Sequence, residues 1–210
     1  MNTDTARVHT ITTLDELKAR YGEPSGAAVA KELDHVSAHY RAMIEASPFM
    51  ALATAGPEGL DCTPRGDHAG FVRVADDKTL LLPDRRGNNR TDSLHNIIRD
   101  PRVALLFLIP GVGETLRVNG RAVISVEPSL LASFAVDGKA PRSVLVVSVE
   151  RVYFQCSKAL VRSKLWDPAT QIPRNALPST GTMVQALSKG AIDGATYDRE
   201  LPVRVPQQLW

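Results

Sequence analysis

The side chains best suited to chemistry stand in one segment, Pro83 to Arg90, which reads PDRRGNNR. Three arginines, two asparagines and a glycine follow an apolar run there and precede an amphipathic stretch that begins at Thr91. Arginine presents paired donors that match phosphate oxygens, and the free N–H groups at a helix N-terminus also favour an anion. The segment therefore indicates an anion site between a strand and a helix. A solvated basic loop, whose Asn and Asp side chains only form turns, accounts for the same residues equally well.

A second cluster, Thr63 to Asp67, reads TPRGD and again combines an arginine, a glycine and a carboxylate. If the strand that carries it neighbours the strand before Pro83, Arg65 and the PDRRGNNR segment meet at one phosphate. The alternative is a hairpin turn in which Arg65 and Asp67 pair with each other on the surface.

A third group of polar residues lies in the stretch TLRVNGR, where strand alternation places Arg117, Asn119 and Arg121 on one face. Two arginines and an amide on one strand face suit a wet cleft or a subunit interface. An ordinary exposed strand face is the simpler alternative.

A fourth group recurs at helical spacing, so that Lys158, Arg162 and Trp166 share one face of a predicted helix. A single tryptophan is most often a core anchor. Beside two cations it also suits the flank of an aromatic ligand.

Other kinds of site find less support in the sequence. His35 and His39 have the i, i+4 spacing of metal ligands, but no third ligand matches, which favours a surface pair. The stretch GVG at 111–113 is followed by a strand pattern, whereas a dinucleotide fingerprint requires a helix there. Phosphate-binding P-loop and nucleophile-elbow motifs are absent from the sequence.

Composition narrows the class of protein. The chain has 210 residues, of which 43% are hydrophobic, and this suits one large domain with a full core. Its net charge of +2 and aromatic content of 5% argue against a nucleic-acid partner. The two cysteines are far apart in the sequence, and no apolar run is long enough for a bilayer, so we expect a cytoplasmic protein without a membrane partner.

The elements that must position these residues follow from periodicity. Helices are expected at 13–22, 27–46, 91–99, 128–136 and 157–165, and one more around 183–187. In the helix at 91–99, Leu94, Ile97 and Ile98 are expected to face inward. Short strands are expected at 49–55, 60–63, 70–74, 79–82, 103–109 and 143–154. The stretch 115–125 is expected to be either a strand pair that turns at Asn119-Gly120 or one long bent strand with this pair inside it. Closely spaced strands of this kind favour a barrel over a doubly wound fold.

The chain resembles the pyridoxamine 5'-phosphate oxidase-like flavoproteins, the FMN-binding split barrels, and within them a bacterial subgroup. The resemblance covers roughly residues 22–168 and is carried by SPF at 47–49, ALAT at 51–54, TPRGD at 63–67, LPDRRGNNR at 82–90, DSL at 92–94, DPRV at 100–103, TLRVNG at 115–120 and RSKLWDP at 162–168. It implies a mainly β fold with peripheral α-helices, a six-stranded split β-barrel that forms a homodimer with FMN at the subunit interface. The division of the chain is then a helical extension at 1–47, the split-barrel core at 48–168 and a C-terminal tail at 169–210 with one short helix.

The resemblance also implies which residues bind FMN. It places Arg65 and residues of the strand-to-helix turn on the phosphate, with Arg86 as a further possible contact there. It places the strand end at Pro83 beside the flavin ring, Arg117 on a flavin of the other subunit, and a cation and an aromatic after the last strand at the mouth of the site. The implied FMN-binding residues are Arg65, Gly66, Asp67, Pro83, Asp84, Arg85, Asn88, Asn89, Arg90, Ser93, Arg117, Arg162 and Trp166.

The function that the resemblance implies is that of an FMN-dependent oxidoreductase, which passes hydride between FMN and a small organic substrate or a nicotinamide. Pyridoxamine phosphate oxidases end with an Arg-x-His substrate motif, but this chain has no histidine after His95, so vitamin B6 oxidation is not expected. No residue stands out as a catalytic acid or base, and the chemistry is left to the cofactor. The alternative is a protein that binds flavin, or haem, without turnover and acts in storage or sensing.

Overall fold

The computed structural model describes residues 9–209, and the chain divides into two compact units, Met1–Glu32 and Leu33–Trp210. The described part of the first unit contains helices α1 (Leu14–Tyr21) and α2 (Gly26–Ala30). Thr13 Oγ1 accepts a hydrogen bond from Glu16 N at 3.2 Å, and Glu16 Oε2 accepts one from Thr13 N at 3.1 Å. This capping box and the left-handed Gly22 that ends α1 confirm the first predicted helix.

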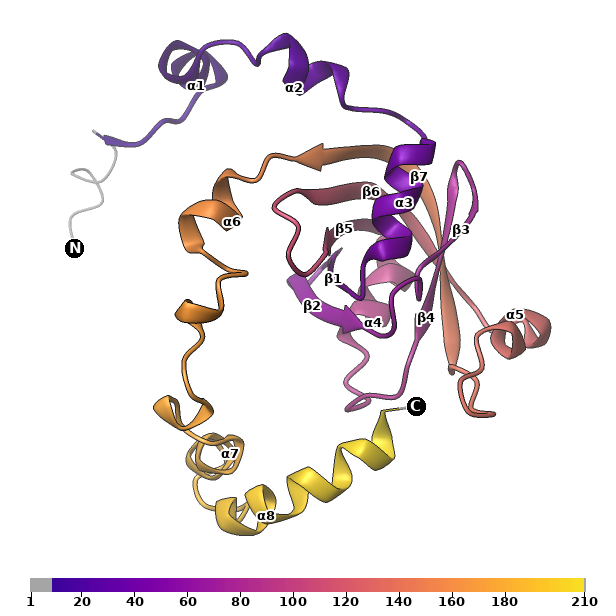
Figure 1. The fold of residues 1–210 in the computed structure, drawn as a ribbon, viewed down its shortest axis with the longest axis vertical. Coiled ribbons are helices and arrows are strands. Elements are labelled where there is room, and N and C mark those ends of the chain that lie inside the picture. Colours follow the sequence, from indigo (N-terminus) through magenta and orange to yellow (C-terminus); the bar gives the residue numbers. More distant parts are fainter. Residues whose placement is uncertain (1–8, 210) are drawn as a thin grey trace. The chain divides into compact units, whose positions relative to one another are not determined.

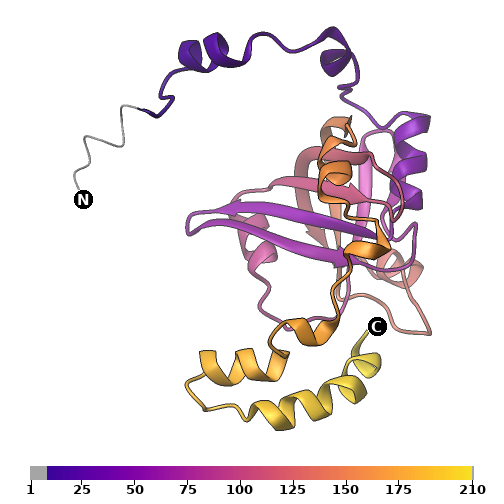
Figure 2. The ribbon, with the colours of Figure 1, turned by 60° about the vertical axis from the view of Figure 1, so that its left-hand side comes forward.

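The second unit is built on an antiparallel sheet, which is seen from two directions in Figure 1 and Figure 2. Among the described residues the sheet has seven strands in the order β2-β1-β5-β6-β7-β4-β3, one more than the six that the family resemblance implied. Edge strands β2 and β3 do not pair with each other within 9–209, so the sheet is not closed into a barrel. The strands are β1 (Phe49–Gly56), β2 (Gly59–Gly66), β3 (Arg73–Asp76), β4 (Thr79–Asp84), β5 (Arg102–Leu108), β6 (Thr115–Ser125) and β7 (Ser143–Gln155).

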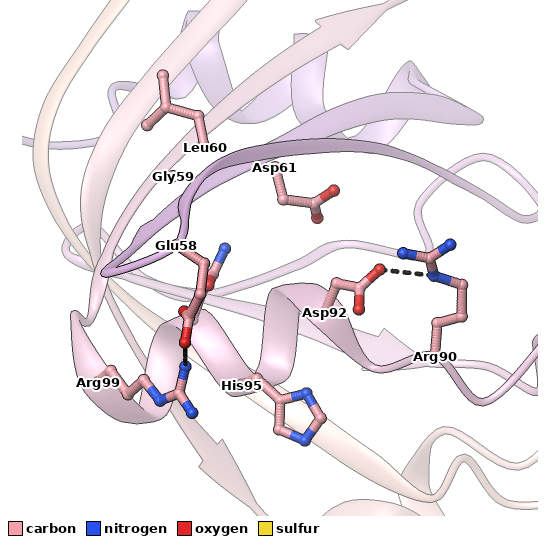
Figure 3. Close-up of a pocket in the computed structure, with 9 residues that line it drawn as sticks. Glu58, Gly59, Leu60, Asp61, Arg90, Asp92, His95 and Arg99 are labelled. Atoms are coloured by element: carbon pink, nitrogen blue, oxygen red, sulfur yellow. Dashed lines mark hydrogen bonds and ion pairs between the residues drawn. The ribbon is translucent and has the colours of Figure 1, made fainter.

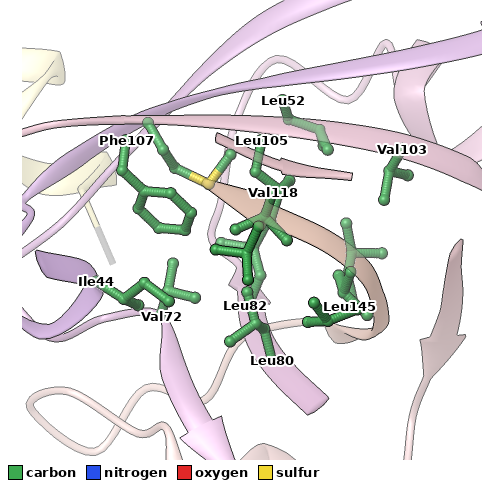
Figure 4. Close-up of a cluster of buried hydrophobic side chains, with 14 of the residues drawn as sticks. Ile44, Leu52, Val72, Leu80, Leu82, Val103, Leu105, Phe107, Val118 and Leu145 are labelled. Carbon is green, nitrogen blue, oxygen red and sulfur yellow. The ribbon is translucent and has the colours of Figure 1, made fainter. Parts of the chain in front are cut away.

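Helices α3 (Ala38–Ala46) and α4 (Asp92–Arg99) pack against the sheet, α3 on β3, β6 and β7, and α4 on β1, β2 and β6. The inner sheet face and these helices enclose one apolar core (Figure 4). Its largest fully buried side chains are Ile44, Met50, Leu52, Leu80, Leu82, Leu105, Phe107, Leu116 and Leu145. Ile98 was expected in this core, but it is 74% exposed, and Asn96 is buried instead, where it donates to Thr54 Oγ1 at 3.1 Å.

The long helix expected at 27–46 is wrong. Residues between α2 and α3 form backbone hydrogen bonds with distant segments. Leu33 exchanges two hydrogen bonds with Val152 of β7, and Val36 N donates to Asp77 O in the β3–β4 turn at 2.7 Å. Ser37 then caps α3 through its Oγ, which accepts from Tyr40 N. The apolar stripe was real, but tertiary pairing at Leu33 and a local cap at Ser37 outweigh the helical period.

Of the two arrangements expected at 115–125, the structure shows the single long strand. The pair Asn119-Gly120 does not turn the chain but lies within the continuous strand β6, at an irregularity in its pairing with β7. Gly120 is required there because a Cβ atom at this position would lie 2.1 Å from the Ser148 carbonyl oxygen. Glycine inside a strand often marks this kind of close backbone approach.

Replacing Gly120 with alanine is therefore expected to destabilise the protein by about 2–3 kcal/mol, because β6 and β7 must separate locally. Urea denaturation of the two proteins measures the difference. Gly87→Ala is the matched control, since nothing lies within 4 Å of a Cβ at Gly87, and it should change stability little. Equal stability of the two alanine variants would contradict the observed packing of β6 on β7.

The remaining helices follow the sheet's later strands. They are α5 (Pro128–Ser133), α6 (Lys158–Ser163), α7 (Thr180–Leu187) and α8 (Gly194–Arg204), with short 3-10 turns η2 (Pro168–Thr170), η3 (Arg174–Ala176) and η4 (Pro206–Gln208). The tail thus contains two α-helices where one was expected. They pack on each other through Gly181 and Gly194, and Asp198 of α8 accepts from Gly181 N at 2.7 Å.

None of the helices within residues 9–209 combines the length and the apolar character that crossing a bilayer requires.

Candidate functional site

Two adjoining cavities lie where β2 and β4 end, and they share Arg65, Arg85, Arg86 and Gly87. The first has a volume of about 150 Å³ and is lined by Arg65, Asp84, Arg85, Arg86, Gly87, Asn88, Asn89, Thr91, Leu94, Arg142 and Ser143. The second has a volume of about 220 Å³ and adds apolar walls from Pro64, Phe71 and Pro83, together with Gly66. A positively charged recess therefore opens beside a more apolar one.

The curvature of the sheet brings the two predicted clusters together. Strands β2 and β4 are not hydrogen-bonded neighbours, because four strands separate them in the sheet order. Even so, Arg65 Nη2 of β2 lies 3.6 Å from Asp84 Oδ1 of β4. The expectation that Arg65 meets the PDRRGNNR segment is thus confirmed, although the strands are not adjacent as it assumed.

Arg65 has donors that no residue within 9–209 satisfies well. Its side chain is 24% exposed, and its Nε is buried without a hydrogen-bond partner among these residues. The Nη1 contacts to Thr63 Oγ1 and to Pro64 O are long, at 3.5 Å each. A buried polar group without a partner is unfavourable, so these donors are suited to a ligand that enters the cavity.

Two lining residues, Arg142 and Ser143, were missed by the sequence analysis. Ser143 is 5% exposed and its Oγ has no partner within the described part of the chain, while Arg142 Nη1 donates to Asn89 Oδ1 at 2.8 Å. The β4–β7 register carries them to the site, because it pairs Asp84 with Ser143. The sequence offers a weak indication, an Arg-Ser pair at the start of a predicted strand, but only the register shows that this strand begins beside Asp84.

Asp84 is the acidic side chain among the residues that line the first cavity, and it is 19% exposed. Burial raises the pKa of the Asp84 carboxyl above its ordinary value, although Arg65 and Arg142 act to lower it. A half-buried carboxyl in a recess of arginines is therefore easier to protonate than an exposed aspartate.

The turn between β4 and α4 holds an unusual backbone. Asn89 and Thr91 have positive φ angles of 62° and 57°, and such a conformation is rare for a β-branched residue such as threonine. Thr91 is the N-cap of α4, yet its side chain does not cap the helix. The first N–H groups of α4 thus keep the positive partial charge of an uncapped helix end beside the cavity.

An ion pair between Arg85 and Asp67 stabilises the turn between β4 and α4. Arg85 Nε donates to Asp67 Oδ2 at 2.8 Å, and Arg85 Nη1 donates to Phe134 O at 2.7 Å. The Asp67 side chain is only 2% exposed, so this ion pair is buried. The alternative pairing of Arg65 with Asp67 on the surface is therefore wrong: each pairs with a residue of the β4 turn.

Arg90 and Ser93 lie away from the two cavities. Ser93 is buried and its Oγ donates to Asp61 Oδ2 at 2.6 Å. Arg90 is exposed, pairs with Asp92 at 2.8 Å, and lines a separate cavity of about 480 Å³ between the β1–β2 hairpin and α4 (Figure 3). There the charged groups already pair, as Figure 3 shows for Arg99 with Glu58, so this cavity is not an open anion site.

The sequence model of the pyridoxamine 5'-phosphate oxidase family matches residues 36–156, which is more than half of the chain. This range contains all seven strands. The chain belongs to the pyridoxamine 5'-phosphate oxidase family. Among curated proteins, none is detectably similar to it.

Solved structures of similar fold include HupZ from Group A Streptococcus, with 20% sequence identity, a TM-score of 0.48, and coverage of 58% of this chain and 95% of that one. A candidate pyridoxamine 5'-phosphate oxidase from Lactobacillus delbrueckii has 19% identity and a TM-score of 0.46, covering 59% of this chain and 98% of that one. A protein related to general stress protein 26 from Clostridium acetobutylicum has 15% identity and a TM-score of 0.43, with coverages of 56% and 86%.

Arg117 of this family member lines neither of the two cavities. The strand register runs from Arg117 through Leu106 of β5 and Ala51 of β1 to Pro64 of β2, so Arg117 lies three strands, roughly 14 Å, from the second cavity. Its guanidinium stacks over the Tyr153 ring, 5.0 Å from the centroid, on the exposed face of β6. Within one chain, Arg117 therefore does not join the site.

Arg162 and Trp166 follow β7 and do not share a helical face, because α6 ends at Ser163 and Lys164 is left-handed. The Trp166 Nε1 donates to Val112 O at 2.8 Å and so ties this segment to the β5–β6 turn. Neither residue lines the two cavities. Their role at a flavin stays a prediction.

Proposed function

We propose that this chain binds FMN in the two adjoining cavities and acts as an FMN-dependent oxidoreductase on a small organic substrate or a nicotinamide. The observation that carries the proposal is a pair of buried atoms in an arginine-lined recess, Arg65 Nε and Ser143 Oγ, which have no partner among the residues that the structure describes. FMN joins a phosphate to a flat, largely apolar ring system, and the site offers a matching pair of environments side by side.

The phosphate end of FMN would lie in the first cavity. Arg65 and Arg142 supply positive charge, Ser143 supplies a hydroxyl donor, and the uncapped start of α4 supplies backbone N–H groups. Asn89 holds Arg142 in place through a 2.8 Å hydrogen bond. The left-handed backbone of the turn is then part of how the site is formed, since strained residues concentrate at ligand sites.

The ring end would lie against the second cavity, where Phe71, Pro64 and Pro83 provide apolar walls. Bound there, FMN supplies hydride transfer chemistry, and the protein orients the ring and excludes water. The half-buried Arg65 stands between the two recesses and contacts both ends of the ligand in this arrangement.

The proposed site is completed in a homodimer, with Arg117 contributed to the flavin of the partner subunit. This is supported by its absence from the lining of both cavities of its own chain and by its place on an exposed sheet face. A positive charge near the ring would raise the reduction potential of the flavin. A measured mass of two chains in solution supports this part of the proposal, and a mass of one chain contradicts it. The cytoplasmic location stays a prediction.

The visible absorption spectrum of the freshly purified protein, recorded before and after addition of FMN, tests cofactor binding. We expect a flavin spectrum at one FMN per chain, followed by bleaching when NADH or NADPH is added and recovery with an oxidising substrate. Bound flavin that neither nucleotide reduces would support binding without turnover. A colourless protein that does not take up FMN would contradict the proposal.

FMN is also expected to raise the thermal unfolding temperature. At a concentration one hundred times its dissociation constant, a ligand that binds only the folded state adds about 2.7 kcal/mol. For a chain of this size that corresponds to roughly 5–10 °C. Differential scanning calorimetry checks the shift, and FMN that leaves the unfolding temperature unchanged at saturating concentration would contradict a folded-state site.

A further inference from the structure

Asp84 places a carboxylate where the proposed function places a phosphate. Its Oδ1 lies 3.6 Å from Arg65 Nη2, and Arg142 N donates to its backbone oxygen. The other charged residues that line this cavity are Arg65 from β2, Arg85 and Arg86 from the turn, and Arg142 from the segment before β7. An ionised Asp84 therefore attracts these arginines but repels any oxyanion that approaches them.

A proton shared between a carboxylate oxygen of Asp84 and an oxygen of the anion removes this repulsion. A carboxylate accepts a hydrogen bond from a phosphate that carries a proton, whereas it cannot accept one from a fully ionised oxyanion. Alternatively, Asp84 itself takes up the proton and donates to the anion. In both cases binding of the phosphate includes one shared proton.

We infer that Asp84 makes this cavity selective for a phosphate group that is bound together with a proton, and that it rejects oxyanions that have none. The inference rests on the proposed function, because it concerns the phosphate end of the same site. Asp84 then determines which anions bind at the phosphate end of the site, and anion binding weakens as the pH rises.

Linkage supports the inference independently of any one ligand. A second negative charge beside Asp84 favours the protonated carboxyl, and by reciprocity protonation of Asp84 strengthens binding of that charge. The arginines of the cavity do not titrate at neutral pH, so they cannot supply this proton. The pKa of Asp84 is already raised by burial, which acts in the same direction.

Inorganic phosphate and sulfate are the probes that separate a proton-linked site from a general anion site. Phosphate and its monoesters carry a proton below about pH 6–7, whereas sulfate keeps both negative charges at every pH used here. Isothermal titration calorimetry of the full-length chain, freed of any bound flavin, measures both affinities between about pH 5.5 and 8.

For the wild-type protein we expect phosphate to bind at least tenfold more tightly than sulfate at about pH 6, and sulfate affinity to fall about tenfold per pH unit, as uptake of one proton requires. In Asp84→Asn, sulfate should gain at least tenfold, its pH dependence should disappear, and the preference for phosphate should shrink to within about threefold. Asp92→Asn is the matched control, because it removes an exposed acid of the same turn, which pairs with Arg90, and it should keep the wild-type preference.

Three results would overturn the inference: equal affinity of the wild type for the two anions, a preference that survives in Asp84→Asn, or loss of both anions in that variant. If Asp84→Asn does not fold, the pH dependence of sulfate binding to the wild type decides alone. Wild-type protein that binds FMN but shows none of this proton linkage would refute the role of Asp84 and leave FMN binding intact. Protein that binds none of the three ligands, FMN, phosphate and sulfate, would refute both the role of Asp84 and the proposed FMN site.

Discussion

Replacing Arg65 with alanine is expected to lower the affinity for FMN by about a hundredfold or more, so that the variant purifies without the cofactor. Arg65 has a buried Nε without a partner and two other donors in the first cavity, so a phosphate gains several charge-assisted hydrogen bonds from this one side chain. Hydrogen bonds to charged groups contribute about 1.5–3 kcal/mol each, and a loss of about 3 kcal/mol is slightly more than a hundredfold in affinity.

Two further variants sharpen this test. Arg65→Lys keeps the charge but loses the planar pair of donors, and it should retain weakened binding. Arg99→Ala removes another arginine, one that pairs with Glu58 at the far end of α4, and it should bind FMN as the wild type does. If Arg65→Ala still purifies with a full complement of FMN, the phosphate lies elsewhere.

Replacing Asp67 with alanine is expected to destabilise the protein by about 3–5 kcal/mol, the usual cost of breaking a buried ion pair by removing one partner. The Asp67 side chain is 2% exposed and the Arg85 side chain 15%, so Arg85 would be left with its charge buried and its carboxylate gone. The β4–α4 turn depends on Arg85, which also bonds to Phe134 O at 2.7 Å. Urea denaturation measures the loss of stability.

The double variant Asp67→Leu, Arg85→Met is the informative companion, because it removes both charges and keeps apolar volume at the site. It should recover much of the lost stability, as replacing a whole buried ion pair by apolar side chains often does. Asp92→Ala, which breaks the exposed pair with Arg90, should change stability little. A fully stable Asp67→Ala would show that Arg85 does not need this carboxylate.

Strands β1, β4 and β5 were predictable from the sequence because each is a short, mainly apolar run that turn residues bound on both sides. The helix at 27–46 was not, because its apolar stripe continues through Leu33, whose backbone pairs with Val152 more than a hundred residues later. Long-range pairing of this kind leaves no local mark. The same limit applies to Gly120, whose role is set by the carbonyl of Ser148 on another strand.

The site shows the same division between local and distant information. Arg65 and the PDRRGNNR turn were identified from residue types alone, and the structure brings them to one cavity. Arg142 and Ser143 arrive through the register of β4 with β7, which the sequence does not reveal. The family resemblance implied an FMN contact for Asp67, and in the structure Asp67 pairs with Arg85. Residue type indicates which chemistry is available, whereas register decides which side chains take part.

The measurement that tests the central claim most directly compares FMN with riboflavin, which has the same ring system and lacks only the phosphate. Both ligands are titrated into the full-length chain, freed of any bound flavin, and followed by calorimetry. The account predicts that FMN binds at one per chain and at least a hundredfold more tightly than riboflavin, because the arginine-lined cavity acts on the phosphate. Equal affinity for the two flavins, or binding of neither, would contradict it.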